Sequence, residues 1–491
     1  MGFQLTPVQK FGEWLPDKGP LNNPGVYSIR NVVPIGDDYT SIEEIHEETS
    51  ALPGECLGVF AYIDSSGLPH TFAGTADKLF QLVDGDWSDV TRESGGYSTT
   101  DDNRWRFAQY GNFVVATNYN DVMQVFDMAS STNFDDLAGS PPRAKYLSVV
   151  NNFLMAVSTF DEVDGTRSFR VWWSGLDDIT TWTPNVSTQA DNQDTPGYGS
   201  CTAVVGSQNS AILFLTGGIF RLDYVGPAAI FTFTLSEPNK GTRVAGSVAS
   251  YSNLVFYWGE DGFNIYNGVS SQPIGHEKID EWFRQRCDFS NIHKMQTVVN
   301  PRRKQVMWAF PSVDGAGICD SILIYNWQAN RFGFVEQFVE AIGATYTEAA
   351  LTDDDTDELT DDPSNDSLTD SVSFMGGRTV LSVVNENHRA GSFSGPARDA
   401  EIITGEIRLN PTGRAYISSI VPVVDCENVQ VELLTRDNQT AAPVSSGLVS
   451  MEETGEAGMY IDARYHRARI VISGPWNRAQ GIQLAYRNTG R

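Results

Sequence analysis

The sequence is poor in the residues that usually build metal centres and disulfide frameworks. It has five cysteines and six histidines among 491 residues. The cysteines are odd in number, far apart and never in CxxC spacing, which argues against a disulfide framework and a zinc site and favours folding in a reducing cytosol. The five cysteines are Cys56, Cys201, Cys287, Cys319 and Cys426. The histidines show no ligand spacing, and we interpret all six as surface or packing residues. They are His46, His70, His276, His293, His388 and His466. We therefore predict no metal and no cofactor.

Basic residues are also scarce. Lys and Arg number 34 against 62 Asp and Glu, which gives a formal charge of −28. Phosphate binding depends on Lys and Arg that displace counterions, so we expect this surface to repel free nucleic acid and anionic membranes. A role in solubility alone explains the charge equally well. The densest basic group, Pro301-Arg302-Arg303-Lys304, is interpreted as a solvated turn, with a phosphate contact as the alternative.

Long apolar runs and catalytic signatures are missing as well. No stretch approaches the roughly 18 apolar residues that a membrane helix requires, and MGFQLTPVQKFGEW does not have the pattern of a signal peptide. We find no GxSxG, HExxH, Walker A or GxGxxG motif in its required context. We predict that the protein is not an enzyme. Glycoside hydrolysis needs only two carboxylates at a set separation, so the many acids leave that activity open.

Short alternating strands joined by tight turns fill most of the chain. Between residues 58 and 395 pairs of apolar strands recur, with turn residues such as Asp84-Gly85, Gly111-Asn112, Asn151-Asn152, Gly217-Gly218 and Asp261-Gly262. These residues supply the positive φ that two-residue hairpin turns require. Units of about 40–50 residues with four strands each are typical of propeller blades. We predict an all-β chain with a six- or seven-bladed β-propeller over residues 55–395.

Two segments depart from this rhythm. EKIDEWFRQRCD (277–288) has apolar residues at helical spacing and predicts one short amphipathic helix on the propeller edge. Residues 351–370 carry nine acids and predict a solvated loop within one blade. Asp353, Asp355 and Asp357 alternate as calcium ligands can, but the Gly and the final Glu of a calcium loop are missing, so we prefer a loop without metal.

The pattern changes near residue 396. GEIRLNPTGRAYISSIVPVV predicts a long hairpin, and four further strands follow, so residues 396–491 predict an antiparallel β-sandwich. Residues 1–54 are interpreted as an irregular segment that packs with this sandwich, with one strand at Tyr27–Val33.

The last strands of this sandwich are basic. No acid follows Asp462, and Arg464, Arg467 and Arg469 fall on or near one strand. Because arginine binds carboxylates through two N–H groups at once and stacks on aromatic rings, we predict that these three residues form part of a subunit or neighbour interface. The alternative is that they balance local acids within the sandwich.

The stretch WWSGLDDITTW (172–182) resembles the Asp-box turn of sialidase-like propellers. Asp177 and Asp178 can cap their own turn, and Trp173 and Trp182 can pack into a blade core. Because Asp boxes are structural in sialidases, the motif supports a propeller and says little about catalysis.

An ordered set of stretches resembles the tail nozzle proteins (also called tail hub, tail tubular or packaged-DNA stabilisation proteins) of short-tailed, podovirus-like phages. The set runs in family order over nearly the whole chain: WLPDKGPLNNPGVYSIRNVVP, FAGTADKLFQL, RWRFAQYGNFVVATNYNDVMQVFD, SPPRAKYLSVVNNFLMA, RVWWSGLDDITTWTP, EDGFNIYNGVSSQPIG and ARYHRARIVISG.

The resemblance implies a structural virion protein, assembled in the host cytoplasm and located in the tail. Such proteins form a hexameric ring below the portal and the adaptor, or head-completion protein, extend the DNA channel and retain DNA until ejection. Tail fibres or a spike would be further partners, genomic DNA would pass without specific binding, and no membrane anchor is expected. An acidic lumen would repel the phosphates of the passing DNA. The alternatives are a sialidase-like glycosidase acting on cell-surface sugar and a fibre- or receptor-binding hub without a conduit role.

Overall fold

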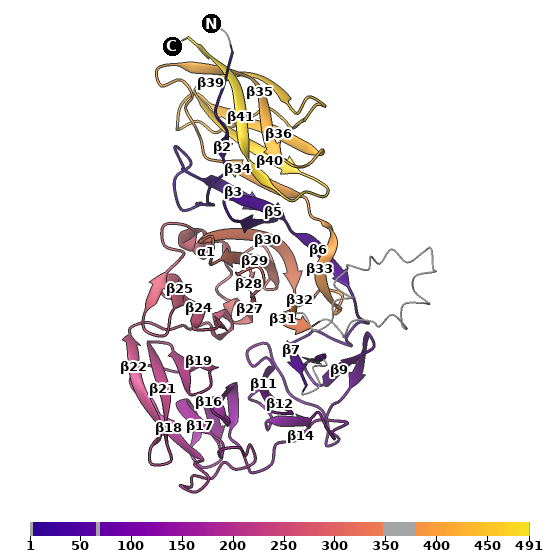
Figure 1. Cartoon of the computed structure of the whole chain (residues 1–491), viewed down its shortest axis with the longest axis vertical. Coiled ribbons are helices and arrows are strands. Elements are labelled where there is room, and N and C mark those ends of the chain that lie inside the picture. The colour runs from indigo at the N-terminus through magenta and orange to yellow at the C-terminus, as the bar shows by residue number, and fades with distance from the viewer. Residues whose placement is uncertain (1–2, 65–68, 347–378, 491) are drawn as a thin grey trace.

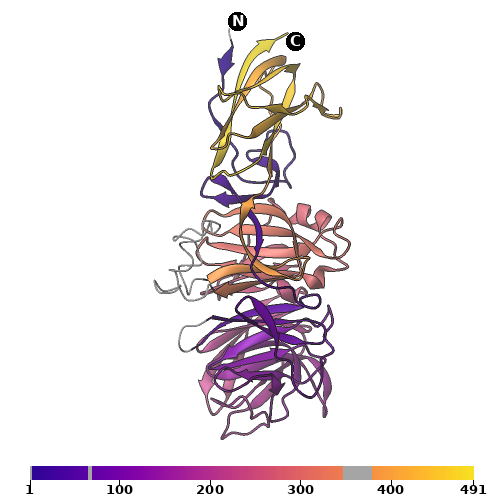
Figure 2. The same ribbon diagram turned by 90° about the vertical axis from the view of Figure 1, so that its right-hand side faces the viewer.

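The computed structural model describes residues 3–64, 69–346 and 379–490. The molecule is elongated, with a β-propeller at one end and an antiparallel β-sandwich at the other (Figure 1). Figure 2 shows that the sandwich stands off one edge of the propeller, with both chain termini at its far tip. The acidic segment 351–370 lies outside the described residues. It includes Asp353, Asp355 and Asp357, the ligands that the calcium alternative would require.

The described strands form seven antiparallel blades of four strands each, of which six are separate sheets and one, blade 6, is part of an 11-stranded sheet. Blades 1 and 2 consist of β7 (Gly58–Ile63), β8 (Pro69–Gly74), β9 (Leu79–Val83), β10 (Asp86–Asp89), β11 (Arg106–Tyr110), β12 (Phe113–Thr117), β13 (Gln124–Asp127) and β14 (Asp135–Asp136). Blades 3 and 4 consist of β15 (Arg143–Val150), β16 (Phe153–Asp161), β17 (Gly165–Trp173), β18 (Asp191–Asp194), β19 (Cys201–Gly206), β20 (Ser210–Leu215), β21 (Gly218–Gly226) and β22 (Ile230–Pro238). Blades 5 and 6 consist of β23 (Ala249–Tyr251), β24 (Leu254–Gly259), β25 (Gly262–Tyr266), β26 (Ser271–Pro273), β27 (Gln296–Asn300), β28 (Gln305–Pro311), β29 (Cys319–Asn326) and β30 (Arg331–Val339). Blade 7 consists of β31 (Ala341–Tyr346), β32 (Thr379–Val384), β33 (Ala390–Ala397) and β6 (Glu43–Glu47).

Apolar cores lie between neighbouring blades, and the core between blades 5 and 6 extends without a break into the sandwich. The first strand of each blade faces the axis, and β31 contacts β7, which closes the ring. The core between blades 7 and 1, for example, joins Cys56 and Phe80 to Val384. The outer strand of blade 7 is β6, which comes from the N-terminal segment and pairs with β33. The ring is thus closed by chain segments more than 300 residues apart.

Several blade hairpins turn where the sequence predicts. Asp84 and Gly85 both have positive φ, as do Asn151 and Asn152, and each pair forms the two-residue loop between adjacent strands. Two other turns differ from the prediction. Gly217-Gly218 and Asp261-Gly262 are shifted by one residue, because Gly218 and Gly262 already begin β21 and β25. A close approach explains the glycine at 262, where a Cβ would lie 2.1 Å from an oxygen of Asp280.

The sandwich consists of two sheets built from both ends of the chain. One sheet contains β1 (Gln4–Leu5), β2 (Gln9–Lys10), β5 (Asp38–Ser41), β41 (Ala479–Thr489), β35 (Arg414–Val424) and β39 (Ala457–Ala463). The other contains β3 (Val26–Arg30), β34 (Ala400–Thr404), β40 (Tyr465–Ile472), β36 (Val429–Arg436), β37 (Val444–Ser445) and β38 (Val449–Ser450). Strand β4 (Val32–Ile35) pairs with both β30 and β5, so blade 6 continues into the first sheet.

Two expectations for the chain ends need correction. The segment 1–54 is not irregular apart from one strand, because it contains β1 to β6, and β6 belongs to the propeller. The predicted long hairpin from Gly405 to Val424 is also wrong. Ile407 bridges to His466 instead, and β35 pairs along its whole length with β41 and over Ala415–Ile420 with β39, because these strands offer it more backbone hydrogen-bond partners than the short segment before the turn does.

The predicted helix is present and joins the two parts of the molecule. Helix α1 (Asp280–Arg286) buries Phe283 and packs Trp282 against Trp14 of the N-terminal segment, with ring centroids 4.7 Å apart. The Asp17 carboxylate accepts hydrogen bonds from the backbone N–H groups of Glu281 and Trp282 at 3.0 and 2.7 Å. Two short 3-10 helices, η1 (Ala245–Ser247) and η2 (Ile292–Lys294), lie beside blades 5 and 6. No helix among the described residues is long and apolar enough to cross a membrane.

Candidate functional site

The predicted interface arginines lie on and beside β40, at the outer face of the sandwich. Side chains of β40 alternate between half-buried and buried positions, which places Arg467 and Arg469 on one face and His466 and Ala468 on the other. Arg464 lies before the strand, in the connection from β39. The structure therefore brings two of the three residues together, and Arg464 is outside their row.

Arg469 is held by carboxylates of its own chain. Its Nε and Nη2 donate to Oε2 of Glu401 on β34 at 2.9 and 2.6 Å, and its Nη1 donates to Oε2 of Glu432 on β36 at 2.9 Å. Arg467 lies over the ring of Tyr27 at 4.8 Å from the centroid, and burial lowers its pKa. Both side chains therefore serve contacts within the sandwich. Arg464 makes no hydrogen bond or ion pair with any described residue.

The Arg469 contacts continue as a ladder of alternating charges toward the propeller. Glu401 lies 3.9 Å from Arg30 of β3, Arg30 lies 3.8 Å from Glu336 of β30, and Glu336 lies 3.2 Å from Arg286 of α1. The ladder thus runs from β36 across four further elements to the helix at the junction. Charges in such a network support one another more than isolated surface pairs do.

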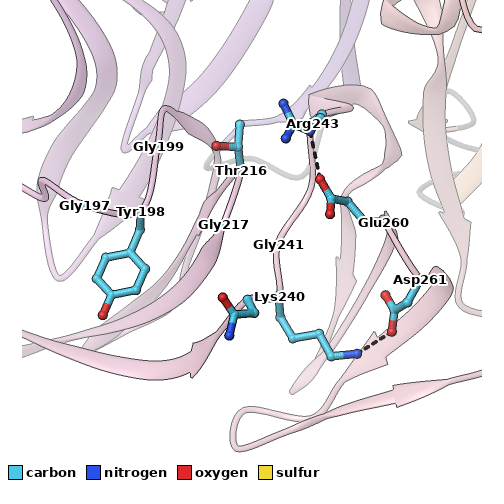
Figure 3. A pocket seen from close by; sticks show the side chains of 11 residues that line it. Gly197, Tyr198, Gly199, Thr216, Gly217, Lys240, Gly241, Arg243, Glu260 and Asp261 are labelled. Carbon is cyan, nitrogen blue, oxygen red and sulfur yellow. Dashed lines mark hydrogen bonds and ion pairs between the residues drawn. The ribbon is translucent and has the colours of Figure 1, made fainter.

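A shallow pocket of about 720 Å³ lies between blades 4 and 5 (Figure 3). Its wall is largely backbone, because Gly197, Gly199, Gly217 and Gly241 line it.

The charged side chains of this pocket form ion pairs with one another. Lys240 pairs with Asp261, and Nε of Arg243 donates to Glu260 at 3.1 Å, with both of the latter side chains exposed. Each carboxylate of the pocket is thus engaged by a cation, which makes both poor candidates for a general acid or base. The arrangement suits a weakly held polar ligand better than hydrolysis.

The Asp-box-like turn has the structural role that the sequence predicts. Asp178 accepts hydrogen bonds from the backbone N–H and the hydroxyl of Thr180 at 2.8 and 2.6 Å, and these bonds lower its pKa. Trp173 and Trp182 are buried in two neighbouring blade cores. Asp177 differs from the prediction, because it accepts a hydrogen bond from Asn152 of the adjacent hairpin instead of capping its own turn.

Within the described ranges no three His, Cys, Asp or Glu side chains are grouped so that they could hold a metal ion.

A group of basic side chains at the propeller axis was missed in the sequence. Arg104, Arg106 and Lys145 line a small cavity there. The available signal was the alternation Arg104-Trp105-Arg106 at the start of a first strand, which places two cations on the side opposite a core tryptophan.

Comparison with known proteins gives no family. No protein-family model matches the chain, and no curated protein matches it. A chain in a crystal structure of the mitotic checkpoint complex is similar over 74% of this chain and 98% of its own length, at 13% identity and a TM-score of 0.39. A chain in the crystal structure of BBS1N with ARL6DN is similar over 72% and 96%, at 8% identity and a TM-score of 0.38. The extracellular domain of a one-component system from B. thetaiotaomicron is similar over 90% and 63%, at 10% identity and a TM-score of 0.41. Likenesses this distant carry no argument about function.

Proposed function

We propose that the protein is a structural virion protein of a short phage tail. In this proposal it forms a ring, the nozzle or hub, that extends the DNA channel below portal and adaptor and retains DNA until ejection. Support comes from the ordered resemblance of the sequence and from the acidic surface, which suits a conduit that DNA must not adhere to. The sandwich would join subunits of a hexameric ring, and the propeller would face outward toward fibres or a spike.

The observation that carries this proposal is an exposed aromatic cluster at the tip of the sandwich. Arg487 of β41 lies between the rings of Phe3 and Tyr416, at 5.2 and 4.9 Å from their centroids. Phe3 is 52% exposed, and Leu5 of β1 is 56% exposed. Aromatic and arginine side chains are enriched at protein interfaces, because they bury large areas and still form polar contacts. Both chain ends meet here, far from the propeller.

Light scattering coupled to size exclusion, with negative-stain images, tests the ring. We expect closed rings in the wild-type protein, and monomers in the double variant Phe3→Asp, Leu5→Asp, because it places carboxylates in the apolar contact. Val163→Asp is the matched control, because Val163 is 93% exposed on blade 3 and lies away from the sandwich. A wild-type protein that remains monomeric at tens of micromolar, or a double variant that assembles as the control does, contradicts the proposal.

A further inference from the structure

The axial cavity of the propeller collects positive charge on an otherwise acidic chain. It measures about 70 Å³ and is lined from several sides of the ring, by Arg106 of blade 2, Lys145 of blade 3 and Arg243 beside blade 5. With Arg104, four Lys or Arg side chains face two lining carboxylates, Asp101 and Asp102. The chain as a whole has 34 basic residues against 62 acids, so this excess of cations is a local departure from its composition.

Both carboxylates of the cavity lie nearest to basic groups of η2. Asp101 lies 3.0 Å from Nζ of Lys294, and Asp102 lies 3.6 Å from Nε2 of His293. Arg243 pairs with the exposed Glu260. No described carboxylate forms an ion pair with Arg104, Arg106 or Lys145.

Two of these cations are the guanidinium groups of Arg104 and Arg106. Arg104 is 8% exposed and uses Nη2 alone, which donates to the carbonyl oxygens of Cys56 and Glu340 at 2.8 and 2.7 Å. The half-buried side chain of Arg106 makes no hydrogen bond or ion pair with any described residue, and burial together with Arg104 lowers its pKa. Among the described residues, the Nζ of Lys145 has no carboxylate partner, and it lies 5.2 Å from the centroid of the Tyr119 ring. Half-buried cations without an acceptor are partly desolvated, and a bound anion would compensate for the solvation that they lose.

We propose that this cavity binds a small tetrahedral oxyanion of the size and charge of phosphate, with Arg106 and Lys145 as its direct ligands and Arg104 as a supporting donor. Guanidinium groups match the oxygen spacing of such an ion, and Lys supplies a point charge. The volume is far below the roughly 300–1,000 Å³ of sites for larger organic ligands. The site is independent of the proposed tail function, since it needs only the closed propeller.

Titration of the full chain with inorganic phosphate tests the site, at constant ionic strength with chloride as the balancing anion. We expect saturable binding by calorimetry and by ³¹P NMR line broadening. Arg106→Gln should weaken it at least tenfold, because it removes a direct ligand. Arg302→Gln is the matched control, since Arg302 is exposed on the turn between β27 and β28 and should leave binding unchanged.

Absence of saturable binding in the wild type, or equal binding by Arg106→Gln, overturns the site, and loss in Arg302→Gln alone moves phosphate to the turn. Acetate that binds as tightly as phosphate overturns the tetrahedral assignment. If circular dichroism reports that Arg106→Gln is unfolded, Lys145→Gln carries the same expectation.

Discussion

His466 is a buried imidazole whose burial lowers its pKa to about 4. It is 1% exposed, and its Nε2 donates to the carbonyl oxygen of Ala415 at 3.2 Å, which holds the neutral ring in place. In the unfolded chain the pKa of histidine is near 6.5. Between these two values the unfolded state binds more protons than the folded state, so the free energy of unfolding decreases as the pH falls from about 6.5 to about 4.

We predict that His466→Gln reduces this loss of stability by about 3 kcal/mol. The figure follows from the pKa difference, because one pKa unit represents roughly 1.4 kcal/mol. Urea unfolding at pH 7 and at pH 4.5 measures it. An identical pH dependence in wild type and variant would show that His466 protonates freely in the folded state.

Asp280 affects the pH dependence of stability in the opposite direction to His466. It is 4% exposed, and burial raises its pKa to about 6, above the 3.8 of an ordinary Asp. The folded state holds its proton between these values, so this residue removes stability as the pH rises from about 4 to about 6. We predict that Asp280→Asn, which can still accept the hydrogen bond from Phe263 N–H, gains up to about 3 kcal/mol relative to wild type across that window. Parallel melting curves at pH 4 and pH 7 measure the difference, and a constant difference contradicts it.

At the scale of the elements, β40 depends on the pairing of Arg469 with β34 and β36. Arg469→Glu would place a third carboxylate between Glu401 and Glu432. Because this both removes a partner and adds repulsion, we predict a loss of about 2–4 kcal/mol in the free energy of unfolding.

Arg464→Glu is the informative companion variant. Arg464 has no partner among the described residues, so we expect a change within about 0.5 kcal/mol. If the arginine interface exists, this variant alone should weaken ring assembly at unchanged stability. Chemical unfolding and light scattering on both variants separate a packing role from an interface role, and equal stabilities for the two would contradict the ladder.

Helix α1 is coupled to the N-terminal segment through Asp17. We predict that Asp17→Ala costs about 1 kcal/mol, because two helix N–H groups lose their acceptor, and that it increases hydrogen exchange at Glu281 and Trp282. Asp37→Ala is the control, since Asp37 makes only an exposed ion pair at 3.6 Å with Lys10. Equal exchange in both variants would mean that the cap contributes nothing.

At the scale of the whole molecule, sandwich and propeller share structure. Strand β4 joins blade 6 to the sandwich sheet, and one apolar core contains Trp308 of blade 6, Trp14 of the N-terminal segment and Ile470 of β40. The ladder of charges crosses the same junction. We predict a single cooperative calorimetric transition at neutral pH. Two transitions well separated in temperature would show that the parts unfold independently.

The sequence alone determined the features that depend on near neighbours. Strand alternation, positive-φ residues such as Asn151 and Asn152, and the apolar spacing around Phe283 are local signals, so they predicted the all-β class, several hairpins and α1. The turn around Asp178 is of the same kind, because its acceptor and its donors lie within three residues.

Only the tertiary structure decided what joins distant segments. Strand β6 closes blade 7 against β33, Asp17 caps a helix 264 residues away, and Arg469 is neutralised by Glu401 and Glu432 from two other strands. The axial meeting of Arg106, Lys145 and Arg243 has the same origin. Spacing along the chain carries no information about such contacts, because they arise when the ring of blades closes and brings side chains from opposite sides to one axis.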